Sequence, residues 1–127
     1  MRRVALGVDP VEPYSKVIKA DGFIHIKSHV GLDFDTEEIV EGIAEQTRVT
    51  LDWLRKALEH AGGQMSGLVK VNVYMSDIDS DFDGMNAAYD EYMREAGLDK
   101  PPARTTVGVP LSWDGLLVQM DALAVDE

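Results

Sequence analysis

The sequence contains no cysteine among its 127 residues, and it has no apolar run long enough to cross a bilayer. Without cysteine, the chain can form no disulfide and has no thiolate to act as a nucleophile or a metal ligand. A membrane-spanning helix needs about 20 apolar residues, and the apolar stretch after the basic N-terminus is too short for a secretory signal. We therefore expect a cytoplasmic protein with no membrane partner.

Positive charge is also scarce, because the sequence has only 12 Lys and Arg residues but 23 Asp and Glu residues, which gives a formal net charge of −11. Nucleic-acid binding depends on cationic side chains that neutralise phosphates, and the sequence has no basic stripe to supply them. We therefore expect no nucleic-acid partner. An anionic ligand must be attracted by a local cation in so acidic a chain, which makes each arginine and lysine worth examining.

The hydrophobic pattern predicts a single α+β domain over residues 1–127, a length typical of one domain. Asp21-Gly22 stands between two strand-like runs, a strong signal for a β-hairpin. The expected elements, in chain order, are strands at 3–6, 17–20 and 23–27, a helix, a strand at 67–75, a second helix, and strands at 104–109 and 116–124. Strands that alternate with amphipathic helices predict one mixed sheet with both helices on the same face. The other face is most simply covered by self-association.

The two helices are predicted from apolar stripes and from signals at their ends. Asp35 stands three residues before Glu38, a capping-box spacing, so the first helix is expected to begin at Asp35. The Gly62-Gly63 pair is expected to end it. Ser80 is expected to cap the second helix.

Arg104 follows a Pro-Pro-Ala turn at the start of a predicted strand. Strand alternation places Arg104 and Thr106 on one face of that strand. A guanidinium is a planar fork that binds a carboxylate through two parallel hydrogen bonds. An isolated arginine is usually a solvated surface residue paired with a carboxylate, so the case for a ligand depends on the residues around Arg104.

Those residues carry a family resemblance. The run Pro102-Ala103-Arg104-Thr105-Thr106-Val107, with residues 117–125, resembles the C-terminal signature of the Rid (YjgF/YER057c/UK114) family. Three further segments resemble family elements: Pro13-Tyr14, Val73-Tyr74-Met75-Ser76-Asp77 and Met85-Asn86-Ala87-Ala88-Tyr89. The similarity covers nearly the whole chain in the right order and spacing.

The resemblance implies a chorismate-mutase-like fold and a homotrimer whose sheets form a central barrel-like core, with ligand clefts between subunits. It implies a hydrolase acting on C–N bonds, which converts enamines or imines of small carboxylates to ammonia and a 2-oxo acid. It implies no metal and no organic cofactor. The alternative is a non-catalytic trimer that binds small carboxylates or other metabolites.

The resemblance also implies roles for individual residues. Arg104 matches the substrate-carboxylate arginine, Tyr14 a tyrosine that closes the pocket, and Asn86 an asparagine near the cleft. Thr106 stands where a main chain contacts substrate or water, so we expect it to take part in catalysis together with Gln119. Each has a structural alternative: Tyr14 could anchor a turn, Asn86 could be a buried polar residue bonded to backbone, and Thr106 suits any strand.

Gln119 and Lys27 depart from the imine-hydrolase pattern. Gln119 stands where deaminating members have a glutamate that orients and activates water, and a glutamine cannot take a proton from water as a carboxylate can. Lys27 replaces a serine at the cleft. It either adds a second, substrate-binding cation near Arg104 or extends from a strand edge to solvent. Asp121 lies on the same strand face as Gln119, and we expect it to pair with Lys27 or Arg104.

Overall fold

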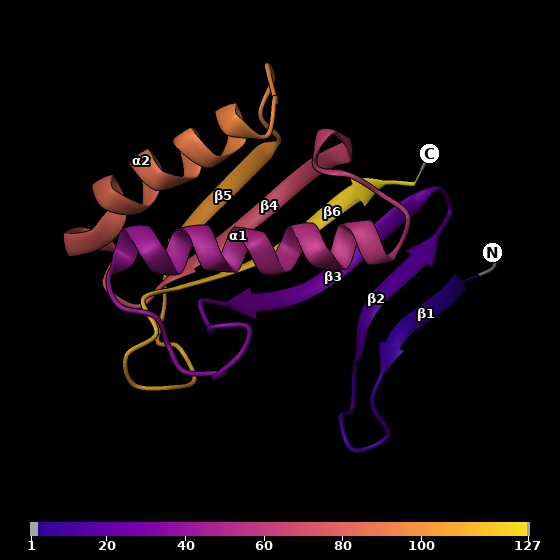
Figure 1. Ribbon diagram of the computed structural model, residues 1–127, viewed down its shortest axis with the longest axis horizontal. Helices are drawn as coiled ribbons and strands as arrows, with labels where there is room; N and C mark the ends of the chain where they lie inside the picture. The colour runs from indigo at the N-terminus through magenta and orange to yellow at the C-terminus, as the bar shows by residue number, and fades with distance from the viewer. Residues whose placement is uncertain (1–2, 127) are drawn as a thin grey trace.

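The computed structural model describes residues 3–126 as one mixed six-stranded sheet with two long helices on one of its faces (Figure 1). The strands are β1 (Arg3–Val8), β2 (Ser15–Ala20), β3 (Phe23–Val30), β4 (Leu68–Met75), β5 (Ala103–Gly108) and β6 (Val118–Val125). The helices are α1 (Ile43–His60), α2 (Ile78–Glu95) and the short 3₁₀ turn η1 (Met65–Gly67). The predicted α+β class, the order of elements and the placement of both helices on one face are confirmed.

The sheet order is β1-β2-β3-β6-β4-β5, so the last strand of the chain is inserted between β3 and β4. Neighbouring strands are antiparallel except β4 and β5, which are parallel. A parallel pair needs a crossover connection, and α2 supplies it. As a result β5, which carries Arg104, is an edge strand, whereas β6, which carries Gln119, lies inside the sheet (Figure 1).

Two glycine-containing turns that the sequence predicts are confirmed. Asp21 and Gly22 both have positive φ, 52° and 82°, as a two-residue type I′ hairpin turn requires. At the end of α1, the N–H of Gly62 donates to Glu59 O and the N–H of Gly63 donates to Leu58 O. These two bonds form a Schellman motif, with Gly62 at φ 88° in the left-handed region.

The predicted start of α1 at Asp35 is wrong, because the helix begins eight residues later at Ile43 with Gly42 as its N-cap. The Asp33 carboxylate accepts hydrogen bonds from the backbone N–H groups of Asp35 and Thr36. A short polar side chain that bonds nearby backbone offers an alternative to the helix. This segment is therefore a loop, closed by the isolated bridge between Leu32 and Ile39.

The second helix begins slightly before the predicted cap. Its N-cap is Asp77, whose side chain accepts a hydrogen bond from the backbone N–H of Ser80 at 3.3 Å. Ser80 therefore lies within the first turn of α2 rather than capping it. Asp79 and Asp81 add negative charge to that turn, which favours the positive end of the helix dipole.

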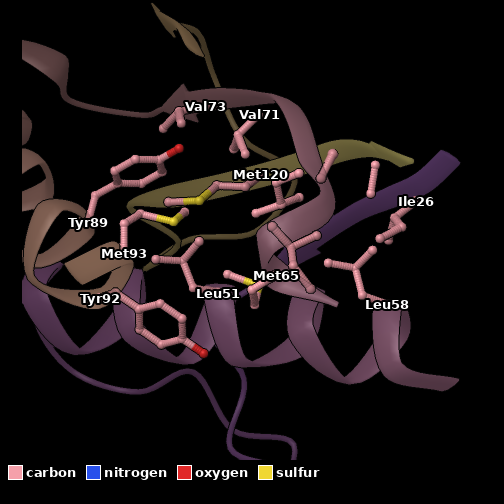
Figure 2. Packing of buried hydrophobic residues seen from close by; sticks show 14 of the residues in the cluster. Ile26, Leu51, Leu58, Met65, Val71, Val73, Tyr89, Tyr92, Met93 and Met120 are labelled. Carbon is pink, nitrogen blue, oxygen red and sulfur yellow. The ribbon is translucent and has the colours of Figure 1, made fainter. Parts of the chain in front are cut away.

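The hydrophobic core fills the space between the two helices and the sheet face that they cover. Figure 2 shows Leu51 of α1 and Tyr89 and Met93 of α2 gathered around Met120 of β6. Alternate residues of the central strands supply the sheet side, namely Val71, Val73 and Met75 of β4 and Val118, Met120, Ala122 and Ala124 of β6. The residues between them, which include Gln119, therefore point to the face without helices.

Candidate functional site

Arg104 points from β5 toward α2, on the face of the sheet that the helices cover. Its strand neighbour is Val71, a fully buried core residue of β4. Arg104 Nη2 donates a hydrogen bond of 2.7 Å to Asn86 Oδ1. The guanidinium carbon lies 4.7 Å from the centroid of the Tyr89 ring, a distance at which a cation is attracted to the face of an aromatic ring. These contacts hold the side chain in one orientation.

Helical spacing explains why α2 can support the guanidinium. Phe82, Asn86 and Tyr89 are four and three residues apart, so they lie along one side of the helix. Tyr89 is 5% exposed, and its hydroxyl has no hydrogen-bond partner among the described residues. Burial raises the pKa of this hydroxyl to about 12. Tyr89 therefore serves as a neutral, buried ring beneath Arg104.

A cavity of about 360 Å³ opens beside the guanidinium. It is lined by the α2 residues that support Arg104 and by the Pro101-Pro102 turn that leads into β5. Within residues 3–126, Arg104 takes part in no ion pair with a carboxylate. The guanidinium thus has N–H groups available for a ligand, in an orientation that Asn86 sets.

A second group of predicted site residues lies where β3 ends and β6 begins. Tyr14, Lys27 and Gln119 line one cavity of about 360 Å³ together with Trp113. Lys27 Nζ lies 6.0 Å from the centroid of the Tyr14 ring and donates a hydrogen bond of 2.9 Å to the carbonyl of Ser28. The sequence therefore identified three residues that the fold brings together.

Lys27 owes its position to an irregularity in β3. The pairing of β3 with β6 shifts register between Ile26 and His29, so the strand bulges at Lys27 and Ser28. Bulges redirect side chains and occur next to functional sites. Burial lowers the pKa of the Lys27 ammonium, and the charge of Lys16 lowers it further. Lys27 is therefore a half-buried cation directed at the cavity rather than a lysine extended into solvent.

Arg104 and Gln119 lie on opposite faces of the sheet within one chain. Arg104 pairs with Val71 of β4, and Gln119 pairs with Tyr74, three positions further along the same strand. Side chains an odd number of positions apart point to opposite faces of a strand. Thr106, which pairs with Val73, lies on the Arg104 face. Lys27 lies on β3, which β6 and β4 separate from β5, so it is not brought near Arg104 within one chain.

The predicted pairing of Asp121 with Lys27 or Arg104 is wrong. Its two carboxylate oxygens accept hydrogen bonds of 2.8 Å from Asn72 Nδ2 and from the Tyr74 hydroxyl. Both partners belong to β4, which lies directly beside β6. Asp121 therefore fixes polar side chains on the sheet face without helices and leaves both cations available.

Gln46, which sequence reasoning missed, holds the loop that carries Trp113. Its amide nitrogen donates to the carbonyls of Val40 and Gly115, and its amide oxygen accepts from the N–H of Leu117. The residue is 2% exposed. A buried side chain whose polar atoms all have partners rigidifies the segments that it joins. Gln46 thus positions one wall of the Gln119 cavity.

Other cavity residues were also missed. Tyr89 lies in a segment that carried the family resemblance, but its position beneath Arg104 depends on the pairing of β5 with β4. Trp113 precedes the Asp114-Gly115 turn and had no signal beyond its size. Glu12, which lines an adjoining cavity, lies close enough to the Tyr14 hydroxyl to raise the pKa of that hydroxyl.

Neither a metal cluster nor a membrane span occurs in the part of the chain that the structure describes. Within residues 3–126, no three His, Asp or Glu side chains come together in a way that could hold a metal ion. No helix among these residues is long and apolar enough to cross a membrane.

Comparisons with known proteins agree with this fold. The family model described as "Endoribonuclease L-PSP" matches residues 5–126. A RutC family protein of Pyrococcus abyssi is 39% identical over 119 residues, which cover 93% of this chain and 90% of that protein. The mitochondrial protein mmf2 of Schizosaccharomyces pombe is 36% identical over 117 residues, covering 90% and 88%. The crystal structure of the yjgF gene product of E. coli has a TM-score of 0.86 at 26% identity, covering 100% of both chains.

Proposed function

The chain belongs to the endoribonuclease L-PSP (YjgF/RutC) family, and we propose that within it the chain is an enamine/imine hydrolase acting on small, carboxylate-bearing reactive metabolites. The observation that carries this proposal is the geometry of Arg104. Its guanidinium is oriented by Asn86 and Tyr89, has no carboxylate partner among residues 3–126, and faces a cavity. A planar fork held in this way suits the carboxylate of a small acid.

The complete site requires two copies of the chain. Arg104, Asn86 and Thr106 form one half-site, and Tyr14, Lys27 and Gln119 form the other, where β3 ends and β6 begins. In a homotrimer, the β5 edge of one subunit would lie against the Gln119 cavity of the next, so that each cleft combines both halves. Closed cyclic assemblies repeat one such contact around the ring. The sheet face without helices would then line the central core.

The reaction that this cleft would catalyse is R–C(=NH)–COO⁻ + H₂O → R–CO–COO⁻ + NH₃. Arg104 holds the carboxylate, while the backbone near Thr106 and the Gln119 amide orient a water molecule at the imine carbon. A C–O bond forms and the C–N bond breaks. The two protons of water leave on the nitrogen as ammonia, and the oxygen stays on carbon. Lys27, with its lowered pKa, is placed to move a proton to the departing nitrogen.

A non-catalytic binder is the second candidate, and Gln119 is the observation that favours it. An amide can hydrogen-bond a water but cannot accept its proton. In that case the same cleft would hold a 2-oxo acid or a related carboxylate without turnover. RNA is a poor ligand for the hydrolase and for the non-catalytic binder alike, because a chain of net charge −11 has few cations to neutralise phosphates.

Ammonia release decides between the two candidates. Imines would be generated in place by an amino-acid oxidase, and ammonia would be followed with wild type, Arg104→Ala and buffer alone. We expect wild type to accelerate release and Arg104→Ala to lose that acceleration. A wild type that never exceeds buffer would exclude the hydrolase. Calorimetric binding of 2-oxobutanoate by that inactive protein would then support the binder.

A further inference from the structure

A further cavity, of about 470 Å³, lies between β3 and α1 and adjoins the Gln119 cavity. Tyr14, Lys27 and Trp113 line both cavities, so the two form one depression with two lobes. The lobe between β3 and α1 reaches as far as Lys56 and His60 of α1. Ligand sites commonly measure roughly 300–1,000 Å³. The depression therefore offers space well beyond the reacting end of a short acid.

Lysine side chains gather on the lobe between β3 and α1, which we call the cationic lobe, although the chain as a whole is strongly acidic. Lys16, Lys27 and Lys56 all line it, and none of them forms an ion pair within residues 3–126. Lys16 and Lys27 lie close enough for the charge of Lys16 to lower the pKa of Lys27. Two carboxylates, Glu12 and Glu37, also line the lobe, so the lysines outnumber them. Like charges held together in a cavity favour an anionic occupant.

Flat aromatic side chains form the walls between these lysines. The rings of His29 and Trp53 stack with centroids 5.9 Å apart and an interplanar angle of 2°. Trp53 is fixed by a hydrogen bond of 2.8 Å from its indole N–H to the carbonyl of Leu32. Trp113 and Tyr14 stand at the junction of the lobes, 55% and 51% exposed. Apolar walls with a few charged groups suit a carbon chain that ends in an anion.

We infer that this cationic lobe binds a second carboxylate, at the far end of the substrate, and that the protein therefore acts on 2-imino dicarboxylates. The inference rests on the proposed function, in which Arg104 of a neighbouring subunit holds the first carboxylate. The reacting carbon then lies at Gln119, and the rest of the substrate extends past Trp113 toward Lys56. Lys16 and Lys56, which line this lobe but not the Gln119 cavity, neutralise its terminal carboxylate.

Binding of stable 2-oxo acids tests this lobe without depending on turnover. Calorimetry would compare the binding of 2-oxoglutarate and of 2-oxobutanoate to wild type, Lys56→Gln and Lys16→Gln. Lys100→Gln is the matched control, because Lys100 is exposed and lines neither lobe of the depression nor the cavity beside Arg104. We expect wild type to prefer the dicarboxylate by about tenfold, as for charged hydrogen bonds in a half-buried site. The preference should fall severalfold in Lys56→Gln and Lys16→Gln but not in Lys100→Gln. Equal affinities in wild type, or an unchanged preference in both lobe variants, would overturn the inference.

Ammonia release from the imines of glutamate and of 2-aminobutyrate separates the two proposals. If the protein releases ammonia from both imines faster than buffer does, but with equal kcat/KM, the hydrolase proposal stands and the binding of a second carboxylate in the cationic lobe is excluded. If wild type binds 2-oxoglutarate tenfold more tightly but releases no ammonia, the cationic lobe does bind a second carboxylate and the hydrolase proposal is excluded. We expect release from both, with the glutamate-derived imine favoured in kcat/KM.

Discussion

Arg104 and Gln119 extend from opposite faces of the same sheet, because their β4 neighbours, Val71 and Tyr74, are three positions apart. The first residue points toward α2 and the second toward the cavity at the end of β3. One chain cannot place both side chains around one small molecule. Any site that uses both must be shared between subunits.

Arg104→Lys should lose most of the activity although it keeps the positive charge. A lysine has no planar fork and cannot reproduce both the bond to Asn86 and a bidentate bond to a carboxylate. We expect kcat/KM for imine hydrolysis to fall roughly a hundredfold, about 2.7 kcal/mol. Steady-state kinetics would check this, with Arg94→Lys, on the exposed surface of α2, as the control. Activity of Arg104→Lys within twofold of wild type would show that bidentate binding is not needed.

Gln119→Glu should increase ammonia release. A carboxylate at this position can accept a proton from the attacking water, and general-base catalysis typically contributes about 10²–10⁴-fold. Part of that gain is expected here, roughly tenfold or more, with a rate that declines at acid pH as the new carboxyl is protonated. The pH–rate profiles of wild type, Gln119→Glu and Gln119→Ala would be compared. A glutamate variant no faster than wild type at any pH would exclude water activation at this position.

Gln46→Ala should destabilise the fold. The substitution leaves the backbone groups of Val40, Gly115 and Leu117 without their side-chain partner. Each buried polar group that lacks a hydrogen bond costs about 1–3 kcal/mol of stability. We expect a loss of about 2 kcal/mol or more in the free energy of unfolding, measured by urea denaturation. Gln64→Ala is the control, because Gln64 is exposed and its side chain makes no capping bond. Equal stability of the two variants would contradict the role assigned to Gln46.

His29 should make stability depend on pH. Burial, followed by the charges of Lys27 and Lys16, lowers the pKa of His29 from 6.5 to about 4. Because the folded pKa is lower, the unfolded chain binds the proton first. The contribution of His29 is therefore present above about pH 6.5 and is lost as the pH falls toward 4, by up to about 1.4 kcal/mol per pH unit.

Urea denaturation at several pH values would measure this slope. The slope between pH 6.5 and 4 should be smaller in His29→Gln than in wild type, and unchanged in His25→Gln, whose histidine is exposed on β3. Identical slopes for wild type and His29→Gln would show that His29 titrates in the folded protein as it does in the unfolded chain.

Much of the fold could be predicted from local patterns, and the failures have local causes too. The Asp21-Gly22 turn and the Gly62-Gly63 helix end are encoded by residues next to one another, so the sequence predicts them well. The start of α1 was placed too early because the Asp33 side chain bonds to the backbone of Asp35 and Thr36. A capping-box spacing cannot show that a competing acceptor stands two residues upstream of it.

The site was harder to predict than the fold, because it depends on contacts between distant segments. The family resemblance selected Arg104, Asn86, Tyr14, Lys27 and Gln119, but it gave no distances between them. Their separation into two groups follows from the insertion of β6 between β3 and β4. That order pairs residues far apart in the sequence, which a periodic pattern does not encode. Gln46 was missed for the same reason, since its partners Gly115 and Leu117 lie about 70 residues away.

Subunit mixing tests the shared site most directly. Arg104→Ala and Gln119→Ala would each be purified, then unfolded and refolded together in equal amounts, and the ammonia release of the mixture compared with that of each variant refolded alone. If each cleft takes Arg104 from one subunit and Gln119 from the next, random trimers regain about a quarter of the intact clefts. We expect the mixture to recover roughly that fraction of wild-type activity. A mixture no more active than the average of the two variants would contradict it.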